Sequence, residues 1–437
     1  MARICIVTPG QIGANPRVVK EADALHAAGH TVSVIATRMV EHVEPRDLAV
    51  MRCRSWSAFR IDLRSPLRWT LLRIGQLGAR SAYLRGLARR PDFTWRAYAR
   101  PLQAAAMRAP ADLYMAHYPD ALPAVAAAAR KYGAQYTYDA EDFHPGDWPD
   151  EPRYKIERQL VRAIEARFLP GCAFTTAASP GIAEAYAETY GIAAPLVVLN
   201  AFPIANSAPA PMPTRRTEPG PSLYWFSQTT GPDRGLESTV RAIAMAGTRP
   251  HLYLRGMPST GYADALLDLA QSLGVRDRIR LLAPDEPDRM EELAAAYDLG
   301  LCAETGHTAS RRLCLTNKLF SFLLAGVPPL LSDTPAQARF AAEAGLSDLV
   351  FRCDDPAALA ALIDGLLGDP ARLAAARARA WRLGQERYNW ERECRHLVEA
   401  VRLAGFRPTP PTASASALRA CGQAAGPGRM DLNGGPR

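Results

Sequence analysis

Three loops of the sequence carry side chains that could hold a phosphorylated ligand. Arg234 lies in the glycine-bearing loop 231–235, directly before an expected helix. Asn317 and Lys318 occupy the first turn of another expected helix, and Gly13 lies in a loop that precedes a third. Free N–H groups at a helix N-terminus favour an anion, and a guanidinium can donate two hydrogen bonds to a phosphate. Each loop therefore predicts an anion site, with a ligand-free turn or a solvated surface cation as the alternative.

A second set of polar side chains follows two expected strands, 112–115 and 135–138. His117 comes at the end of the first strand, and Asp139 and Glu141 come after the second. Because the carboxyl ends of parallel strands meet at one edge of a sheet, we expect the three side chains to face a ligand site. Hydrogen bonds to substrate hydroxyl groups are one interpretation. A buried structural histidine and helix-capping carboxylates are the other.

These side chains are placed by strands and helices that alternate through both halves of the chain. The first unit is a strand at 4–7, a helix that starts with Asn15 as its N-cap and Pro16 at its first position, and a strand at 31–35. Similar units recur after residue 110 and again after residue 222. Repeated βαβ units predict an α/β fold with parallel sheets.

The alternation is interrupted once, which divides the chain into domains. Residues 203–221 are dominated by Pro, Ala, Ser and Thr and predict a linker. We therefore expect two doubly wound Rossmann-like domains, residues 1–202 and 222–406, facing a central cleft where two substrates react. The last helices could pack back on the N-terminal domain. Residues 407–437 are rich in Pro, Gly, Ala and Ser and predict a disordered tail.

Composition and missing motifs exclude several classes of protein. With 437 residues, 48% hydrophobic and 22% charged, the chain is expected to be globular. Its eight cysteines show no CxxC pair or metal-ligand spacing, so neither a disulfide framework nor a bound metal is expected. No GxGxxG follows the first strand, which argues against a nicotinamide cofactor. No secretion signal and no run of about 18 apolar residues occurs, so we expect a cytoplasmic protein.

Residues 52–108 form a basic, aromatic segment that predicts an insertion in the N-terminal domain. It contains thirteen Arg and no Lys against Asp62 and Asp92, and 13 − 2 gives +11, more than the +8 of the whole chain. A helix expected to start at Ser65-Pro66 carries Leu and Ile at helical spacing with Arg nearby. This pattern is typical of a helix on an anionic membrane surface, which would make the protein peripheral at the inner face of the membrane; a solvated Arg-rich face is the alternative. No nucleic-acid-reading motif accompanies the charge, so no nucleic acid partner is expected.

Five motifs in a fixed order carry a resemblance to a known family. They are Asn15-Pro16-Arg17-Val18 with Lys20, the segment Ala116 to Pro123, Tyr138-Asp139-Ala140-Glu141-Asp142, the loop Gly231 to Gly235, and Thr316-Asn317-Lys318-Leu319-Phe320 with Ala325-Gly326-Val327-Pro328. In this order and spacing, from Arg3 to about Leu403, the sequence resembles a family 4 glycosyltransferase of the two-domain GT-B architecture.

The resemblance implies transfer of a sugar, with retention of anomeric configuration, from a nucleotide diphosphate donor to a lipid-linked, polysaccharide or small-molecule acceptor. The implied catalytic residues are His117, Arg234 and Lys318. The implied donor- and phosphate-binding residues are Gly13, Arg234, Gly235, Glu304, Asn317, Lys318 and Ser321, and those on the acceptor side are Asn15, Arg17, Asp139 and Glu141. Fixed cations and helix N-termini can stabilise a departing nucleoside diphosphate, so neither a metal nor another cofactor is expected.

One departure from the family pattern concerns the donor site. The family commonly has a Glu at the position of Ser321, and Glu304 is the nearest acid that could substitute for it. Because that Glu is missing, two other functions stay open. One is a nucleotide-sugar epimerase-like or phosphorylase-like enzyme on the same fold, and the other is a non-catalytic nucleotide-sugar-binding partner subunit.

Overall fold

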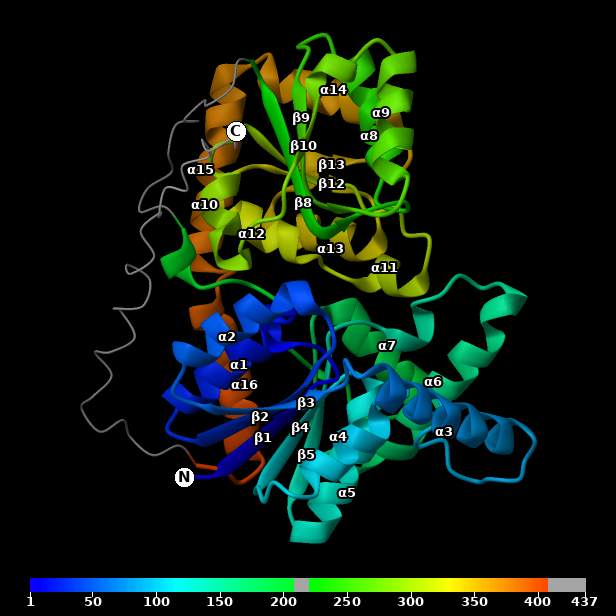
Figure 1. Cartoon of the computed structure of the whole chain (residues 1–437). Coiled ribbons are helices and arrows are strands. Elements are labelled where there is room, and N and C mark those ends of the chain that lie inside the picture. Colours follow the sequence, from blue (N-terminus) through cyan, green and yellow to red (C-terminus); the bar gives the residue numbers. More distant parts are fainter. Residues whose placement is uncertain (208–219, 408–437) are drawn as a thin grey trace, which may run out of the picture.

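The chain folds into two lobes, each built on a parallel sheet with helices on both faces (Figure 1). The computed structural model describes residues 1–207 and 220–407. The expected fold class, two doubly wound Rossmann-like domains, is confirmed. Most of the expected linker and the expected disordered tail, at 208–219 and 408–437, lie outside the described residues.

The N-terminal sheet has seven parallel strands, and its strand order reverses at the central pair β1 and β4. In spatial order the strands are β3 (Ser57–Asp62), β2 (Thr31–Arg38), β1 (Arg3–Val7), β4 (Leu113–His117), β5 (Gln135–Ala140), β6 (Thr175–Ala177) and β7 (Leu196–Val197). Strands β1 and β4 are almost wholly buried, as expected for a parallel sheet covered on both faces. Ligands of such sheets bind at the carboxyl ends of the strands near this reversal.

The helices of the N-terminal lobe start at the residues that the sequence indicates. Asn15 caps α1 by accepting a hydrogen bond from Val18 N–H at 3.2 Å, with Pro16 at the first helical position. The helices are α1 (Pro16–Ala27), α2 (Glu44–Arg52), α3 (Pro66–Leu84), α4 (Ala99–Ala106), α5 (Leu122–Tyr132), α6 (Lys155–Phe168) and α7 (Pro180–Tyr190). Their start points fix which loops face the other lobe.

The C-terminal sheet has six parallel strands. In spatial order they are β10 (Ile279–Leu282), β9 (His251–Pro258), β8 (Ser222–Thr230), β11 (Leu299–Cys302), β12 (Pro329–Ser332) and β13 (Val350–Phe351). The helices are α8 (Leu236–Met245), α9 (Tyr262–Ser272), α10 (Met290–Ala294), α11 (Ala309–Leu313), α12 (Asn317–Ala325), α13 (Pro335–Ala344), α14 (Pro356–Leu367), α15 (Pro370–Glu386) and α16 (Trp390–Leu403). Helix α12 spans the range expected from the sequence and ends at Gly326, whose φ of +67° suits glycine.

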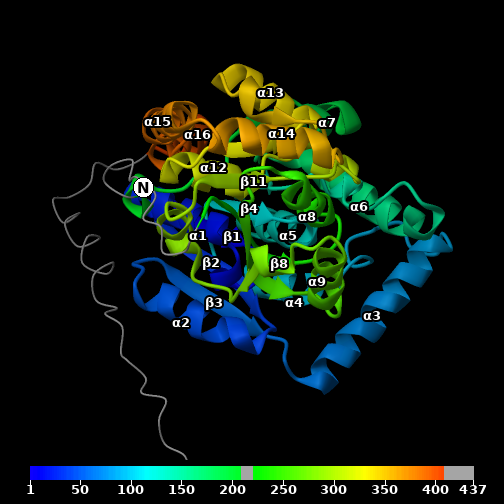
Figure 2. The same ribbon diagram turned by 90° about the horizontal axis from the view of Figure 1, so that it is seen from above.

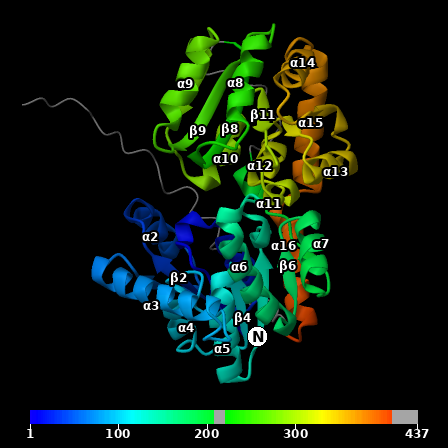
Figure 3. The same ribbon diagram turned by 90° about the vertical axis from the view of Figure 1, so that its right-hand side faces the viewer.

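The final helix, α16, belongs to the N-terminal lobe although it follows the C-terminal domain in sequence (Figure 3). Its Leu397 and Val401 are fully buried in the same core cluster as Val18 and Ala22 of α1. Where the chain crosses back, Trp390 N–H donates to the Phe202 carbonyl at 2.9 Å. The chain therefore passes between the lobes twice.

The basic segment 52–108 is not a separate insertion, which corrects the expectation from the sequence. Strand β3 is the edge strand of the sheet and pairs with β2 along its whole length. Trp56 and Trp95, expected to interleave with exposed arginines, are 5% and 7% exposed. The Trp56 indole N–H donates to Asp23 at 2.8 Å, which accounts for its burial. Two of the expected surface aromatics therefore stabilise the lobe instead.

Four of the thirteen arginines of this segment form ion pairs with acids of the lobe, of which only Asp62 belongs to the segment. These ion pairs are Arg54 with Asp23, Arg60 with Glu44 and Asp47, Arg64 with Glu41 and Asp62, and Arg80 with Glu157. Only α3 extends away from the body, as Figure 2 shows. Within the described residues, no helix combines the length and the apolar character needed to cross a bilayer.

Candidate functional site

A cleft of about 660 Å³ lies between the two lobes at the carboxyl ends of both sheets. The N-terminal wall is formed by Pro9, Gly10, Gln11, Ala14, Asn15, Met39, Trp95, Arg96, Tyr98, Tyr118, Asp120, Asp142, His144, Asp147 and Trp148. The C-terminal wall is formed by Gln228, Pro232, Asp233, Arg234, His307, Thr308, Ser310 and Arg311. A cleft lined by both lobes is the place where a two-substrate reaction was expected.

The loop before α8 presents Arg234 to this cleft. Gly235 is in the left-handed region with a φ of +69°, and a Cβ there would lie 2.4 Å from the Ala303 carbonyl oxygen. Glycine at 235 therefore lets the loop approach the end of β11, which aligns the start of α8 with Arg234. The Arg234 guanidinium makes no hydrogen bond or ion pair with any residue of 1–207 or 220–407. It is thus an uncompensated cation beside a helix N-terminus.

Three further charged groups lie next to Arg234. The Glu304 carboxylate is only 2% exposed. It accepts a hydrogen bond from Lys318 Nζ at 3.3 Å and lies 3.9 Å from Arg311 Nη1. Lys318 also lies over the Trp225 ring, 5.3 Å from its centroid. We call Arg234, Glu304, Arg311 and Lys318 the C-terminal cluster. It contains three cations and one carboxylate.

The electrostatics of the C-terminal cluster favour a bound anion. Burial and then repulsion by Arg311 lower the pKa of Arg234, so its charged form is less stable than in water. Burial alone would raise the pKa of Glu304, but Lys318, Arg311 and Arg234 lower it below its ordinary value. Glu304 is therefore already ionised and still leaves an excess of positive charge. An anionic ligand on Arg234 and Arg311 would relieve that excess.

Lys318, Asn317 and Ser321 are placed differently from the sequence expectation. Lys318 is only 6% exposed and does not line the cleft, because it is held between Glu304 and Trp225. Asn317 is exposed at the start of α12. Ser321 is fully buried and donates to Glu291 at 2.5 Å. In this conformation neither Lys318 nor Ser321 can touch a ligand in the cleft, which corrects the direct-contact roles implied for them.

Gly13 also serves the fold more than the cleft. Its N–H donates to Asp47 Oδ1 at 2.7 Å, so this group is not free for a phosphate. A Cβ at Gly13 would lie 2.9 Å from Arg46 and 3.0 Å from Asp47 N. The Gly13 loop was expected to close on the phosphates, but the N–H of Gly13 itself is not available to a phosphate in this conformation. The neighbouring residues Gly10, Gln11 and Ala14 line the cleft instead.

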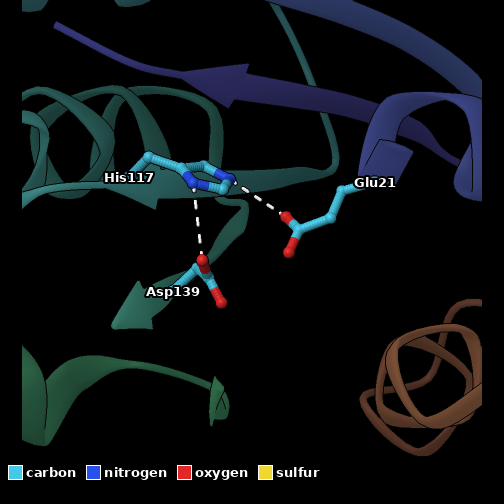
Figure 4. A group of neighbouring side chains, drawn as sticks. All are labelled: Glu21, His117 and Asp139. Carbon is cyan, nitrogen blue, oxygen red and sulfur yellow. Dashed lines mark ion pairs between the residues drawn. The ribbon is translucent and has the colours of Figure 1, made fainter. Parts of the chain in front are cut away.

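The second expected set of residues comes together at the carboxyl ends of β4 and β5, as Figure 4 shows for His117, Asp139 and Glu21. His117 Nε2 lies 3.0 Å from Glu21 on α1, and its Nδ1 lies 3.1 Å from Glu141 and 3.5 Å from Asp139. Arg17 completes this N-terminal cluster. Its Nε and Nη2 donate to the two oxygens of Asp139, both at 2.7 Å.

The N-terminal cluster is charged but internally compensated. Burial disfavours a charged His117, yet Glu21, Glu141 and Asp139 raise its pKa to about 10. Burial likewise opposes ionisation of Asp139, but Arg17 and His117 lower its pKa below the ordinary value. Arg17 also donates to the Val198 carbonyl at 2.8 Å. Imidazolium and guanidinium thus neutralise most of the carboxylate charge within the lobe.

The same three residues, Glu21, His117 and Asp139, offer ligand atoms within 4.8 Å of one another, the spacing of a metal site. Arg17 already places its guanidinium against Asp139 and lies 3.2 Å from Glu21. A metal would also need His117 to be deprotonated, against its raised pKa. Glu21 and Asp139 are therefore better suited to the Arg17 guanidinium and a protonated His117 than to a metal ion.

Burial divides the residues expected to contact an acceptor. Arg17, Asp139 and His117 are completely buried and do not line the cleft, so direct contact with a substrate is wrong for them in this conformation. Asn15 does line the cleft, and it donates from Nδ2 to Glu141 at 3.0 Å. Glu141 keeps a 15% exposed side chain. The sequence thus pointed to this edge of the sheet. Most of the expected residues, however, are buried below the cleft surface and hold its edge in place.

Sequence reasoning missed two groups of cleft residues. Arg311 follows Thr308, whose hydroxyl caps α11 by accepting from Arg311 N–H at 3.2 Å. The signal for it was a Ser-Arg-Arg run shortly after Glu304. The other group is the aromatic and polar wall contributed by Trp95, Asp120 and His144. Nothing in the spacing of these three residues indicates that the fold brings them together.

Comparison with known sequences identifies the N-terminal half. Residues 13–201 match the family described as glycosyl transferase 4-like domain. A D-inositol 3-phosphate glycosyltransferase of Rhodococcus opacus is 30% identical over 183 residues, which are 40% of this chain and 38% of that protein. The protein of the same name from Rhodococcus erythropolis is 29% identical over 276 residues, 59% of this chain and 58% of that one. The chain thus spans less than two thirds of the length of these curated relatives.

Solved structures share the fold across both lobes. Anabaena Alr3699/HepE in complex with UDP and glucose superimposes with a TM-score of 0.68 at 17% identity, covering 93% of this chain and 100% of that chain. Sucrose-phosphate synthase from Thermosynechococcus elongatus gives 0.69 at 15% identity, covering 92% and 99%. At such low identity the likeness shows the two-domain fold alone.

Proposed function

Because residues 13–201 form a glycosyl transferase 4-like domain, which confirms the resemblance seen in the sequence, we propose that the protein transfers a sugar from a nucleoside diphosphate donor to an acceptor. One observation carries this proposal: the C-terminal wall of the cleft presents Arg234 and Arg311 beside the N-terminus of α8. Glu304 pairs with Lys318 and Arg311 and leaves Arg234 without an ion pair among the described residues. A diphosphate has the charge and the oxygen acceptors that this arrangement lacks.

In the proposed reaction the bond between the anomeric carbon and the diphosphate oxygen breaks. An acceptor hydroxyl oxygen forms the new bond to the anomeric carbon, and the hydroxyl proton passes to the departing diphosphate. Negative charge then develops on the departing diphosphate, and Arg234 and Arg311 stabilise it. Lys318 acts indirectly. Its ion pair with Glu304 fixes the carboxylate that positions Arg311. We propose that these cations are sufficient without a metal, and that configuration is retained, as the resemblance implies.

The N-terminal cluster supports the acceptor side in this proposal. Arg17 and Asp139 hold the ends of the strands together, and His117 orients Glu141 through its Nδ1. Of the expected acceptor set, Asn15 lines the cleft, and Glu141, whose side chain is 15% exposed, accepts a hydrogen bond from Asn15. They are therefore our candidates for contact with the acceptor or the transferred sugar.

Purified protein incubated with UDP-, GDP- and ADP-sugars tests the proposal. A nucleoside diphosphate at 100 times its dissociation constant should stabilise the fold by about 2.7 kcal/mol, visible as a rise in Tm. Release of the nucleoside diphosphate with a glycosylated product is the expected result. Stabilisation without turnover would favour the non-catalytic binding subunit, and release without an acceptor product would favour the epimerase-like alternative. No stabilisation by any nucleotide would overturn the proposed function.

We also propose that α3 holds the protein at an anionic membrane surface, where a lipid-linked acceptor is reached. Its outward face carries Leu67, Leu71, Ile74 and Leu77, between 50% and 72% exposed. Trp69, Leu72 and Gln76 lie on the opposite face, and Gln76 Nε2 donates to the Thr94 carbonyl at 2.8 Å. An apolar stripe on a helix with Arg73 and Arg85 exposed suits the boundary of an anionic bilayer.

Vesicle co-sedimentation tests this attachment. The protein should sediment with vesicles of phosphatidylglycerol and phosphatidylcholine and stay in solution with phosphatidylcholine alone. The double variant Leu71→Ser/Ile74→Ser should lose binding, because it removes the centre of the apolar face. Leu403→Ser is a matched control, since Leu403 is 72% exposed on α16. Equal sedimentation with neutral and anionic vesicles would contradict the proposed electrostatic attachment.

A further inference from the structure

Three buried polar atoms in the interlobe cleft have no hydrogen-bond partner among the described residues. They are Trp95 Nε1, Asp120 Oδ1 and His144 Nε2. Trp95 is 7% exposed, and Asp120 and His144 are each 3% exposed. All three line the N-terminal wall of the cleft. Because a buried polar group without a partner costs about 1–3 kcal/mol, the presence of three such groups in residues that line one cavity indicates a ligand.

The three residues reach this wall from distant parts of the sequence. Trp95 lies between α3 and α4, Asp120 lies in the short turn after β4, and His144 lies in the turn after β5. Aromatic contacts fix the wall: Trp95 meets Trp148 edge to face with ring centroids 6.0 Å apart. The Tyr118 ring lies 5.4 Å from that of His144. The wall is therefore a packed part of the lobe that carries polar groups between aromatic rings.

The hydrogen-bonding capacity of this wall is mixed. His144 Nδ1 faces Asp147 at 2.8 Å, and although burial opposes the charge, Asp147 raises the pKa of His144 to about 9. His144 Nε2 is therefore an N–H donor at neutral pH, as is the Trp95 indole. Asp120 Oδ1 supplies an acceptor when it is ionised. A hydroxyl group both donates and accepts hydrogen bonds. A ligand with several hydroxyl groups can therefore accept from Trp95 Nε1 and His144 Nε2 and donate to Asp120 Oδ1.

We propose that this wall is the binding subsite for an uncharged polyhydroxyl acceptor, a sugar or a cyclic polyol, held by hydrogen bonds to Trp95, Asp120 and His144. The inference rests on the proposed glycosyltransferase function. The groups belong to the N-terminal lobe, opposite the cations expected to hold the donor diphosphate. Aromatic rings with a few fixed polar groups are typical of small-molecule sites.

The charges on this wall disfavour a phosphorylated acceptor. Asp120, Asp142 and Asp147 face the cleft from the N-terminal lobe, against Arg96 and His144. Arg96 is also engaged, with its guanidinium 4.7 Å from the Trp95 ring centroid. Burial raises the pKa of Asp120 to about 7, and burial and Asp147 raise the pKa of Asp142. When both are ionised, three carboxylates against two cations would repel the phosphate of a phosphosugar or phosphoinositol.

Saturation-transfer NMR at pH 8 tests the subsite, since Asp120, whose pKa burial raises to about 7, is then mostly ionised. The probes are methyl α-glucopyranoside, methyl α-mannopyranoside and myo-inositol, compared with glucose 6-phosphate and inositol 3-phosphate. Each is measured with and without the nucleoside diphosphate that binds among UDP, GDP and ADP. We expect a signal from at least one neutral probe and a severalfold weaker signal from the phosphates.

Two variants connect the signal to the wall. Trp95→Phe removes the N–H and keeps an aromatic ring, and Asp120→Asn keeps the shape and removes the charge. Both should reduce the neutral-probe signal at least fivefold while leaving nucleotide affinity within twofold. Trp381→Phe is the matched control, because Trp381 Nε1 is also buried without a partner but lies on α15, outside the cleft.

Several outcomes would overturn the inference. They are binding of the phosphates at least as strong as that of the neutral probes, no neutral-probe signal, or an unchanged signal in both variants. A loss of affinity for the nucleotide-sugar in Trp95→Phe, with affinity for the free nucleotide intact, would assign the wall to the donor sugar instead. Failure of every nucleotide to bind would overturn the proposed function, while the neutral probes would still test the wall.

Discussion

The two lobes each hold a cluster of buried charges at the carboxyl end of a central strand, and the clusters differ in how they are balanced. In the N-terminal cluster, Arg17 and His117 face carboxylates at 2.7 to 3.1 Å, and only Glu141 keeps partial exposure. In the C-terminal cluster, Lys318 and Arg311 share Glu304, and Arg234 is left without an ion pair among the described residues. The N-terminal cluster, whose charges compensate one another, stabilises its lobe. The C-terminal cluster has an excess of positive charge that an anionic ligand can compensate.

Breaking the balanced cluster should have the largest effect on folding. Asp139→Asn removes the carboxylate that pairs with both Nε and Nη2 of the buried Arg17 guanidinium and leaves it only the carboxylate of Glu21, at 3.2 Å. It should lower the free energy of unfolding by about 3–5 kcal/mol. Urea unfolding measures this change. Asp112→Asn is the control, because the Arg3–Asp112 pair is 57% and 37% exposed and should contribute about 1 kcal/mol or less. Equal losses in the two variants would remove the distinction drawn for the N-terminal cluster.

The pH dependence of stability should reflect the same cluster. His117 has a folded-state pKa of about 10, above its unfolded value of about 6.5. Its contribution is therefore fully present below pH 6.5 and is lost as the pH rises toward 10, with a slope of at most about 1.4 kcal/mol per pH unit. Urea unfolding at pH 7, 8 and 9 should show this decline, and His117→Gln should flatten it. An unaltered slope in that variant would mean that another group titrates.

Removing a cation from the unbalanced cluster should weaken ligand binding without loss of stability. Arg234→Ala should lower the affinity for the nucleoside diphosphate about 10- to 100-fold, or about 1.4–2.8 kcal/mol, because a charge-assisted hydrogen bond is lost. Titration calorimetry measures this affinity, and Tm should stay the same or rise slightly. Arg312→Ala is the control, since Arg312 is exposed on the same helix as Arg311 and does not line the cleft. Nucleotide affinity within twofold of the wild type would discard the anion site.

A smaller effect is expected from Glu304→Gln. Lys318 and Arg311 lose the carboxylate that positions them, so nucleotide affinity should fall about 3- to 10-fold, or about 0.7–1.4 kcal/mol. Glu291→Gln is the matched control in the same lobe, because Glu291 is buried against Ser321 and lies outside the cleft. Tighter nucleotide binding in Glu304→Gln would show that Glu304 opposes the ligand and only restrains the cations.

Most of the fold could be predicted from the sequence, because parallel sheets and helix caps leave local signals. Asn15-Pro16 gave the start of α1, and the range Asn317–Ala325 gave the whole of α12. Strand β3 was missed, since it is a half-exposed edge strand with arginine in its middle. Strand β13 was missed because it has only two residues.

The site could be predicted less completely, because burial depends on packing between lobes. Motif spacing pointed to Arg234, which lines the cleft, and to Gly235, which follows it at the start of α8. It could not show that Lys318 is covered by Trp225 or that Asp47 takes the N–H of Gly13. Motif spacing also could not indicate that Trp95 and His144 line the same wall, since the 48 residues between them must fold before the two meet.

The docking of α16 has a consequence for how the protein is made. The core cluster that contains Leu397 and Val401 stays incomplete until α16 has been synthesised, so an N-terminal lobe produced without α16 would present bare apolar surface to water. Such a fragment should aggregate, and a synthetic peptide covering 388–406 should keep it soluble. The two lobes are therefore linked in folding as well as in sequence, because α16 follows the C-terminal lobe in the chain and completes the core of the N-terminal lobe.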